Sequence, residues 1–230
     1  MLAVMGAMEE EIALFREAMD DVDKNQKAGL TFYKGEIDNK KIILVHCGIG
    51  KVNAAICTQI LIDDFGVDNI IFTGVAGALS ANLNVLDVVV STDCIQHDLN
   101  VGAFGYEAGT VPRLNKKEFA ADDALVKLAL KSAKNIENFP QIVSGRILSG
   151  DEFIADKQRA LHLADKFSGH CVEMEGAAVA QASYLNDVSF VIIRAMSDKA
   201  DGTADVDFPK FVQQAANNSL ALVREMLKHL

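Results

Sequence analysis

Short apolar runs alternate with amphipathic segments along most of this chain. The runs have the length and composition of buried strands, and the amphipathic segments repeat their apolar positions every three or four residues, as helices do. This alternation, without a linker, a repeat or a change of composition, predicts one α/β domain over residues 1–230, with a mixed central sheet between two layers of helices. Strands are expected at residues 2–7, 31–37, 40–46, 69–75, 86–91, 141–148 and 190–193. Helices are expected at residues 9–19, 51–65, 122–134 and 156–166, and from 208 to the C-terminus.

One segment, residues 94–118, departs from this alternation because it has little periodicity. It contains His97-Asp98, the stretch Phe104-Gly105-Tyr106 and Pro112. Irregular segments of this length are uncommon inside compact domains, and they usually bind a ligand or cover a partner. We therefore expect residues 94–118 to have a functional role.

Composition narrows the classes of function. The net charge of −10 opposes binding to nucleic acid, because such binding depends on Lys and Arg meeting phosphates. No apolar run approaches the roughly 20 residues that span a bilayer, and the acids after the first apolar run argue against a signal peptide. The four cysteines form no CxxC pair, which is typical of buried free thiols in a reducing compartment. We expect an acidic cytoplasmic protein without a nucleic-acid or membrane partner.

Residues 48–53 partly match two common nucleotide-binding motifs but complete neither. Gly48-Ile49-Gly50-Lys51 has the look of a phosphate-binding loop, but Val45 and Val52 stand where that loop needs Gly and Ser or Thr. A dinucleotide-binding turn would need glycine in place of Asn53. The stretch is therefore expected to be a tight turn before a helix, whose backbone amides can still point at a ligand.

Other catalytic classes find no support in the residue patterns. No serine lies in a G-x-S-x-G turn, and the five histidines have no partner pattern. The histidines and cysteines also lack the spacing of a zinc site. Neither a metal nor a cofactor is expected.

Three acids recur where predicted strands end: Glu11, Glu175 and Asp198. Each has an ordinary explanation, since Glu11 could favour a helix N-terminus, Glu175 could open a helix on the surface, and Asp198 could cap a turn. In open α/β sheets, however, ligands bind at the carboxyl ends of the strands. All three acids at one sheet edge predict a shared pocket.

The segments around these acids resemble the 5′-methylthioadenosine/S-adenosylhomocysteine nucleosidases, within the purine nucleoside phosphorylase-like superfamily. The resemblance runs nearly end to end and rests on many short segments in order rather than on any one. The similar segments are Gly6-Ala7-Met8-Glu9-Glu10-Glu11, Gly48-Ile49-Gly50-Lys51-Val52-Asn53-Ala54-Ala55, Thr73-Gly74-Val75-Ala76-Gly77, His97-Asp98, Ala103-Phe104-Gly105-Tyr106-Glu107, Ser149-Gly150-Asp151, Phe153-Ile154, Val172-Glu173-Met174-Glu175 and Ser197-Asp198.

The resemblance implies hydrolysis of the bond between adenine N9 and ribose C1′ in 5′-methylthioadenosine, S-adenosylhomocysteine and 5′-deoxyadenosine. Cleavage leaves positive charge on the sugar and negative charge on the base, so an acid must protonate the purine and a base must activate water, as in inverting glycosidases. By the resemblance, Asp198 protonates the purine at N7, Ser197 orients Asp198, and Glu11 activates the water. Arg194 would hold Glu11, Glu175 or the water in place, with an ordinary ion pair as the alternative.

The resemblance also implies the substrate contacts. Glu175 would accept hydrogen bonds from the ribose 2′- and 3′-hydroxyls, and Met174 would lie against the ribose. Phe153 would stack on the purine, while the backbones of Ile154 and Ala200 would read its edge. The other substrate-binding positions implied by the resemblance are Met8, Ile49, Ala76, Gly77, Glu173 and Phe208.

A partner subunit is also implied. Phe104, Tyr106 and Pro112 match residues that the family lends across a dimer interface. We therefore expect a homodimer in which each pocket is completed by Phe104, Tyr106 and Pro112 of the partner subunit. Such a dimer would account for the irregular segment 94–118.

The substrate and the reaction keep alternatives. Val75 stands where many family nucleosidases carry Ser, and with Gln96-His97-Asp98 it is similar to members that also hydrolyse 6-amino-6-deoxyfutalosine in a menaquinone route. A nucleoside phosphorylase is the nearest other reaction, but the side chain of Val75 cannot bind phosphate. A nucleoside-binding protein without catalysis is opposed by the presence of both Glu11 and Asp198.

Overall fold

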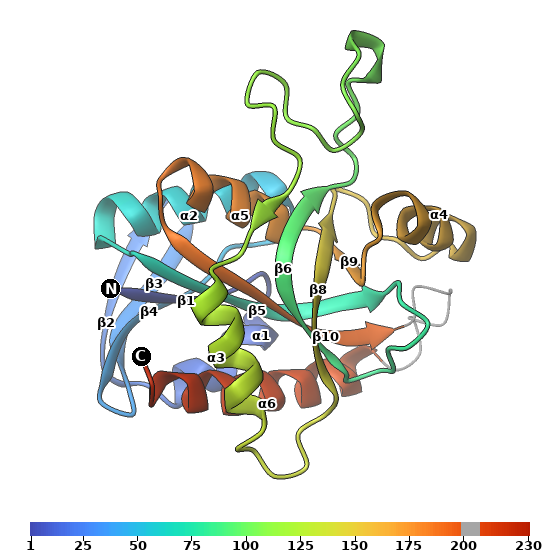
Figure 1. The fold of residues 1–230 in the computed structure, drawn as a ribbon. Coiled ribbons are helices and arrows are strands. Elements are labelled where there is room, and N and C mark those ends of the chain that lie inside the picture. The colour runs from blue at the N-terminus through green and yellow to red at the C-terminus, as the bar shows by residue number, and fades with distance from the viewer. Residues whose placement is uncertain (199–207) are drawn as a thin grey trace.

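Ten strands form one mixed sheet in the part of the chain that this computed structural model describes, residues 1–198 and 208–230 (Figure 1). The strands are β1 (Leu2–Gly6), β2 (Asp20–Lys27), β3 (Leu30–Ile37), β4 (Lys40–His46), β5 (Asn69–Ala78), β6 (Val88–Gln96), β7 (Phe119–Ala120), β8 (Ile142–Ser149), β9 (Cys171–Glu173) and β10 (Ser189–Asp198). Nine of them follow the order β10-β6-β8-β9-β5-β1-β4-β3-β2, and β7 pairs with β6 outside this order. Because β10 also pairs in parallel with β5, the five strands β5, β10, β6, β8 and β9 close on themselves.

Six α-helices surround this sheet among the described residues, five of them on its two faces and the sixth, α4, against Ile95, Leu148 and Val172 (Figure 1). The helices are α1 (Glu9–Glu17), α2 (Lys51–Phe65), α3 (Asp123–Ala133), α4 (Lys157–Phe167), α5 (Gly176–Leu185) and α6 (Phe208–Leu227). Helices α2 and α5 pack on one face, while α1, α3 and α6 pack on the other. The expected cap of α3 is present, because the Asp122 carboxylate accepts hydrogen bonds from the amides of Ala124 (2.9 Å) and Leu125 (3.0 Å).

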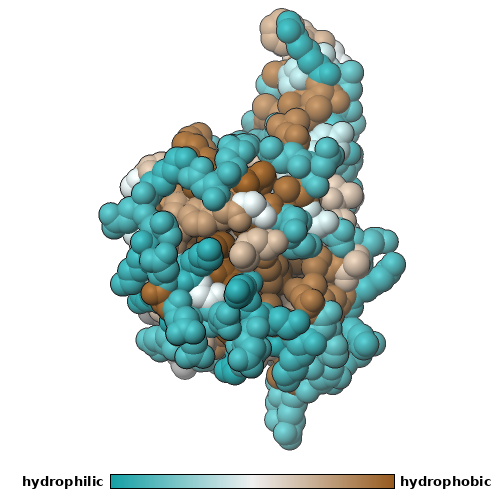
Figure 2. Space-filling view, turned by 90° about the vertical axis from the view of Figure 1, so that its left-hand side faces the viewer, coloured by the Kyte–Doolittle hydropathy of each residue, from teal (hydrophilic) through white to brown (hydrophobic). Residues whose placement is uncertain are grey.

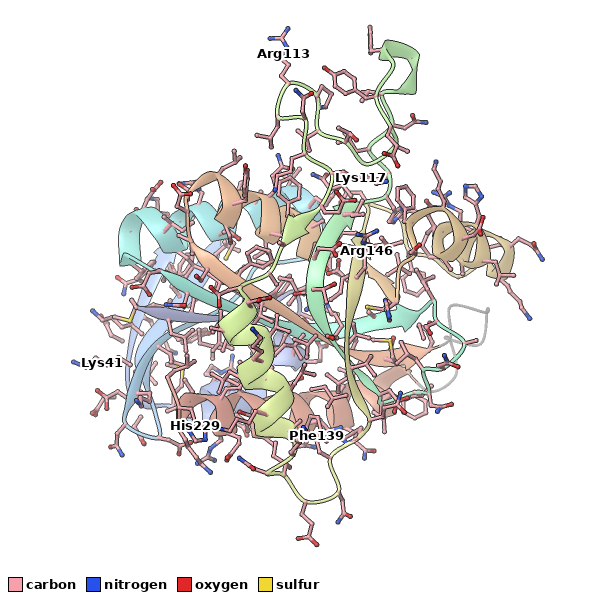
Figure 3. The ribbon with its side chains drawn as sticks, viewed as in Figure 1. Lys41, Arg113, Lys117, Phe139, Arg146 and His229 are labelled. Carbon is pink, nitrogen blue, oxygen red and sulfur yellow. The ribbon has the colours of Figure 1, made fainter. Side chains whose placement is uncertain are left out.

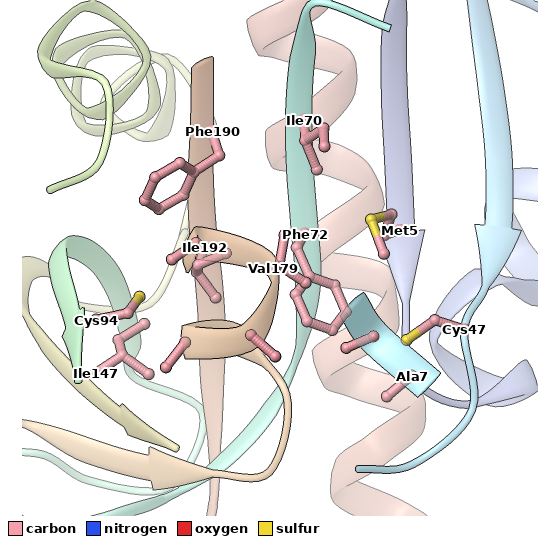
Figure 4. Packing of buried hydrophobic residues seen from close by; sticks show 14 of the residues in the cluster. Met5, Ala7, Cys47, Ile70, Phe72, Cys94, Ile147, Val179, Phe190 and Ile192 are labelled. Atoms are coloured by element: carbon pink, nitrogen blue, oxygen red, sulfur yellow. The ribbon is translucent and has the colours of Figure 1, made fainter. Parts of the chain in front are cut away.

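The central strands are apolar on both sides, and their alternation feeds two cores. In β1, Ala3 and Met5 point to the core under α2 and α5, and Val4 points to the core over α1, α3 and α6. Figure 4 shows the first of these cores, where Phe72 of β5 and Ile192 of β10 pack near Val179 of α5. Strands buried on both faces read as continuous apolar runs, which is why their positions were predictable.

Several strand predictions were wrong in extent or omission: β7 and β9 were not expected, and β10 continues to Asp198, beyond the expected end at Ile193. Strand β2 was not expected: its sequence is polar and all eight residues are exposed, because it pairs only with β3 at the edge of the sheet. A strand without a buried face has no apolar alternation to recognise. The strand expected at 86–91 begins two residues later and continues through Cys94 to Gln96, so the irregular segment is shorter than predicted. Strand β5 likewise runs on to Ala78.

The rest of the irregular segment forms an arm, residues 99–118, that projects away from the body (Figure 1). Its own structure is slight: a 3₁₀ turn, η1 (Gly102–Phe104), and one isolated bridge between Val111 and Lys116. Figure 3 places Arg113 at its far end and Lys117 near the body. In Figure 2, apolar side chains cover much of the arm's lower half and the surface of the body next to it.

The cysteines have the environment that the composition predicts. All four cysteines are buried and unbridged, and burial raises the pKa of Cys57 to about 12, so this thiol stays protonated. In the described ranges, no helix has the length and apolarity needed to cross a membrane.

Candidate active site

A pocket of about 290 Å³ opens where β1, β5, β9 and β10 end. It brings together the three acids that the sequence places at strand ends, Glu11, Glu175 and Asp198. Its lining residues are Ala7, Met8, Glu11, Ile49, Val75, Ala76, Gly77, Glu152, Phe153, Ile154, Val172, Glu173, Met174, Glu175, Ser197 and Asp198. The pocket is therefore apolar over much of its wall, with carboxylates at a few positions, as is typical of small-molecule sites.

Glu11 is one of three acids in the first turn of α1, but its side chain turns toward backbone amides just after β1 and in β5. Its Oε2 accepts hydrogen bonds from the amides of Ala7 (2.6 Å) and Met8 (3.0 Å), and its Oε1 accepts one from Val75 (3.1 Å). The side chain is buried, and burial raises its pKa, although the charge of Arg194 and the three amides act in the opposite direction. Glu11 is thus a fixed carboxylate with enhanced affinity for a proton.

Space for Glu11 depends on the residue at position 74. A Cβ atom there would lie 2.6 Å from Oε1 of Glu11 and 3.0 Å from Nη1 of Arg194. Only glycine leaves room for both charged groups beside β5.

Arg194 on β10 is the largest fully buried side chain among the described residues, and its ionic partner is Glu173. Its Nη2 and Nε donate to Oε2 of Glu173 at 2.7 and 3.2 Å, and its guanidinium lies 4.0 Å from the centre of the Phe72 ring. The ion pair that the sequence leaves as an alternative is therefore present, and among the described residues no hydrogen bond joins Arg194 to Glu11 or Glu175. Its charge nevertheless lowers the pKa of both acids against the effect of burial.

Glu173 has more protein partners than a substrate-binding carboxylate would have. Besides Arg194, its oxygens accept from the Ser149 hydroxyl and from the amides of Glu175 (3.2 Å) and Gly176 (2.8 and 2.9 Å). The Ser149 oxygen in turn accepts from the amide of Ala177 (2.7 Å). Glu173 lines the pocket, but it is occupied in joining β8, β10 and the N-terminus of α5.

Glu175 is the N-cap residue of α5, and its Oε1 accepts a hydrogen bond from the amide of Gly50 (2.7 Å). This amide belongs to the tight turn before α2, so a backbone group of that turn does face the site. Burial and the neighbouring negative charge of Glu173 raise the pKa of Glu175 to about 7.

Asp198 ends β10 beside an irregularity in the sheet. The parallel register between β10 and β5 shifts between Met196 and Asp198, so that Asp198 lies opposite Gly77. Such bulges redirect side chains, and they are common next to active sites. The Ser197 hydroxyl lies 3.1 Å from Oδ2 of Asp198 and 3.3 Å from the carbonyl oxygen of Ala76, and both Ser197 and Asp198 are buried.

The remaining predicted positions divide into three groups. Met8, Ile49, Ala76, Gly77, Phe153, Ile154 and Met174 line the pocket. Phe104, Tyr106 and Pro112 lie on the arm and not in the lining. Ala200 and the side chain of Phe208 lie outside the described residues.

Four lining residues were not predicted: Ala7, Val75, Glu152 and Val172. Ala7 and Val75 contribute backbone amides to Glu11, which no side-chain pattern can indicate. Glu152 lies at the rim and pairs with Arg159 of α4, 2.9 Å away. Within the described ranges, no cluster of His, Cys, Asp and Glu has the arrangement of a metal site.

Known proteins resemble this chain over its whole length. Residues 1–228 match the Phosphorylase superfamily. A 5′-methylthioadenosine/S-adenosylhomocysteine nucleosidase from Bacillus thuringiensis is 44% identical over 230 residues, which are 100% of this chain and 99% of the relative.

Two solved structures are similar to this chain in fold over its whole length. The nucleosidase of that name from Neisseria meningitidis, in complex with methylthio-immucillin-A, is 42% identical with a TM-score of 0.95, covering 100% of this chain and 99% of its own. Futalosine hydrolase from Helicobacter pylori is 33% identical with a TM-score of 0.93, covering 100% and 97%.

Proposed function

This chain belongs to the 5′-methylthioadenosine/S-adenosylhomocysteine nucleosidases of the phosphorylase superfamily, and from that premise we propose how its pocket acts. The enzyme hydrolyses the N-glycosidic bond of 5′-methylthioadenosine and S-adenosylhomocysteine, and of 5′-deoxyadenosine, releasing adenine and the 5′-substituted ribose. The observation that carries this proposal is the meeting of Glu11, Glu175 and Asp198 in one largely apolar pocket.

Asp198 acts on the leaving base. When the bond from N9 to C1′ breaks, its electron pair stays with the purine, and a proton delivered to N7 neutralises the charge. Asp198 can supply that proton from the end of β10, with the Ser197 hydroxyl 3.1 Å away to fix its carboxyl group. Proton transfer of this kind typically contributes a factor of about 10² to 10⁴ in rate.

Glu11 acts on the water. The sugar that loses its base carries positive charge at C1′, and a water molecule that gives up a proton to Glu11 forms the new C1′–O bond. The raised pKa of Glu11 makes it a better proton acceptor than an ordinary carboxylate at neutral pH. Three amides hold its two oxygens, so the base needs little reorganisation to act.

Glu175 binds the ribose, and its ionised form offers both oxygens as acceptors for the hydroxyls of the diol. Its pKa of about 7 means that substrate binding favours the charged form of a group that is half protonated near neutrality. Met174 and Ile49 supply apolar contacts to the sugar and its 5′ substituent, and Phe153, 62% exposed at the pocket, supplies a stacking surface for the base.

Water rather than phosphate suits this pocket. The lining formed by described residues contains no Lys or Arg, and the nearby Arg194 is already neutralised by Glu173. A phosphate at the ribose would lie close to the carboxylates of Glu11 and Glu175, and like charges at short range are strongly unfavourable in a buried site. Hydrolysis is therefore the reaction that the electrostatics of the site favour over phosphorolysis.

A second candidate substrate is 6-amino-6-deoxyfutalosine, cleaved by the same groups. Val75 lines the pocket where many family nucleosidases carry Ser, and the chain is similar to a futalosine hydrolase as well as to nucleosidases. The pattern of Val75 together with Gln96-His97-Asp98 supports a role in the menaquinone route in addition to nucleoside salvage.

The active unit in this proposal is a cytoplasmic homodimer. Phe104 is 82% exposed on the arm, and Ile49, Val52 and Ile56 expose a row of apolar side chains on α2 and the turn before it. Exposed apolar groups of this size are typical of interaction surfaces. Phe104, Tyr106 and Pro112 of the partner subunit would then close the 5′ end of each pocket.

Side-by-side kinetics test the proposed substrates. Adenine release from 5′-methylthioadenosine, S-adenosylhomocysteine, 5′-deoxyadenosine and aminodeoxyfutalosine is measured at equal enzyme concentration, and all four are expected to be cleaved. A preference for aminodeoxyfutalosine would make the menaquinone route the main role. No release from any of the four would overturn the proposed function.

A further inference from the structure

Two sequence features have no place in the chemistry described above: Lys51, which follows the tight turn Gly48-Ile49-Gly50, and the pair His97-Asp98. They are far apart in the chain but meet in the structure. Lys51 opens α2, and His97 and Asp98 lie between the end of β6 and the arm.

The ammonium group of Lys51 is bound on two sides by the end of β6. Its Nζ donates to Oδ1 of Asp98 at 2.6 Å and to Oε1 of Gln96 at 3.1 Å. The amide of Gln96 is itself fixed, because its Nε2 donates to Oε1 of Gln181 on α5 at 2.6 Å. One lysine therefore ties α2 to the root of the arm, and through Gln96 to α5.

Asp151, in the loop after β8, completes a closed ring of hydrogen bonds. Its amide donates to Oδ2 of Asp98 at 3.0 Å, and its Oδ1 accepts from the amide of Lys51 at 2.9 Å. The buried ring of His97 packs against Gly150, where a Cβ atom would overlap its imidazole. Both residues of the His97-Asp98 pair thus hold the same loop.

This ring connects to the pocket at two points. The amide of Gly50, directly before Lys51, donates to Glu175 at 2.7 Å. Asp151 stands two residues before Phe153, which also lines the pocket. Movement of the ring would shift the partner of Glu175 and the loop that carries Phe153 together.

We propose that Lys51, Asp98 and Asp151 form a clasp that couples the root of the arm to both the ribose end and the base end of the pocket. Lys51 and Asp98 are positioning residues: they touch no reacting atom but set where Glu175 and Phe153 stand. This inference rests on the proposed function, which assigns Glu175 to the ribose and Phe153 to the base. Through the clasp, a change in the position of the arm would change the pocket of the same subunit.

The Lys51–Asp98 pair is better shielded from water than the pair of Lys27 and Asp64. The side chains of Lys51 and Asp98 are 16% and 26% exposed, against 54% and 36% for Lys27 and Asp64, a pair at the other end of α2. Shielding from water strengthens an ion pair and its hydrogen bonds. Lys27→Met is therefore a matched control, because it removes the ionic partner of Asp64, which lies on the same helix as Lys51.

Kinetics of Lys51→Met and Asp98→Asn test the proposal. KM for 5′-methylthioadenosine should rise roughly tenfold in each, with kcat changed less than about threefold, because binding contacts loosen while Glu11 and Asp198 stay in place. Lys51→Arg should recover most of the loss. The double variant should be little worse than either single one, since both remove the same interaction. A KM equal to that of Lys27→Met, or additive effects in the double variant, would overturn the clasp.

Hydrogen exchange gives a readout that does not need activity. The amides of Gly50 and Lys51 should exchange at least about tenfold faster in Lys51→Met than in the unmodified protein, and be unchanged in Lys27→Met, as expected when local hydrogen bonds open. Unchanged exchange would contradict the clasp even in an active enzyme. If the unmodified protein releases no adenine but exchange responds as predicted, the proposed function fails while the coupling stands.

Discussion

The carboxylate cluster in the pocket and the arm beside it are built in opposite ways. Glu11, Glu173 and Glu175 are each buried and held by backbone amides, and Arg194 lies among them under β5. The arm, residues 99–118, has one 3₁₀ turn and one isolated bridge, and its Phe104 is 82% exposed.

This difference separates what one chain does alone from what needs a partner. The cluster fixes its charges with groups of its own subunit, so the proposed acid, base and diol acceptor are preorganised within one chain. The arm places large apolar side chains where its own chain covers them little. Its order and its contribution to substrate binding are therefore expected to come from a second subunit.

Asp198→Asn, which changes the carboxylate cluster, should have the largest effect on activity. The amide cannot deliver a proton to the purine, so kcat for 5′-methylthioadenosine should drop by roughly 10³, while the melting temperature changes little. The control Asp122→Asn keeps a helix cap outside the pocket and should leave kcat unchanged. Survival of kcat in Asp198→Asn would remove Asp198 as the general acid.

Glu173→Gln should have the largest effect on stability. The amide leaves the guanidinium of Arg194 buried without a counter-charge, which should lower the free energy of unfolding by about 3–5 kcal/mol in denaturant titrations. Glu152→Gln breaks a half-exposed pair with Arg159 at the pocket rim and should cost less than about 1 kcal/mol. Equal losses in the two variants would show that burial of the Glu173–Arg194 pair does not matter.

Glu175→Gln should change how stability depends on pH. Because the pKa of Glu175 is raised in the folded protein to about 7, the native state holds its proton more tightly than the unfolded chain, and stability falls as pH rises from about 4.5 to 7. Gln carries no such proton, so the variant should gain roughly 2–3 kcal/mol relative to the unmodified protein between pH 5 and pH 8.5. The same stability difference at both pH values would contradict the raised pKa.

Phe104→Ala, which changes the arm, should have the smallest effect on the free energy of unfolding. Its side chain is 82% exposed, so the free energy of unfolding of a single chain should change by less than about 0.5 kcal/mol. KM for 5′-methylthioadenosine should nevertheless rise roughly fivefold, because a partner pocket loses apolar contact. The control Leu161→Ala removes another exposed apolar side chain, on α4, and should leave KM unchanged. An unchanged KM in Phe104→Ala would assign the arm no role at the neighbouring pocket.

The sequence predicted helices and strands where apolar positions repeat, and it did not predict contacts that are made by backbone groups. Helix α2 has the predicted bounds 51–65, because apolar periodicity locates such elements. Glu11 and Asp198 meet because β1 and β10 run parallel to β5 and end at one edge, whereas Glu175 joins them after β9, which runs antiparallel to β5. Strand β2 escaped prediction because it buries no face. The position of Glu173 depends on Arg194, Ser149 and the amides that open α5, a three-dimensional arrangement that no spacing along the chain records.

Lys51 shows both sides of this limit. The sequence predicts no phosphate-binding loop around it, because Val45 and Val52 lack what that loop requires. It gave no indication that the ammonium group would reach Asp98, which lies 47 positions later. Long-range hydrogen bonds between polar side chains become visible only once the sheet brings their strand ends together.

Phosphate dependence tests the central claim most directly, namely that this pocket uses water as its nucleophile. Adenine release from 5′-methylthioadenosine is followed in phosphate-free buffer and again with added inorganic phosphate, and the sugar product is identified by mass spectrometry. The carboxylates around the ribose and the absence of a free basic side chain in the described lining predict the same rate in both buffers and free 5-methylthioribose as the product. A rate that requires phosphate, with methylthioribose 1-phosphate as the product, would contradict the hydrolytic role of Glu11.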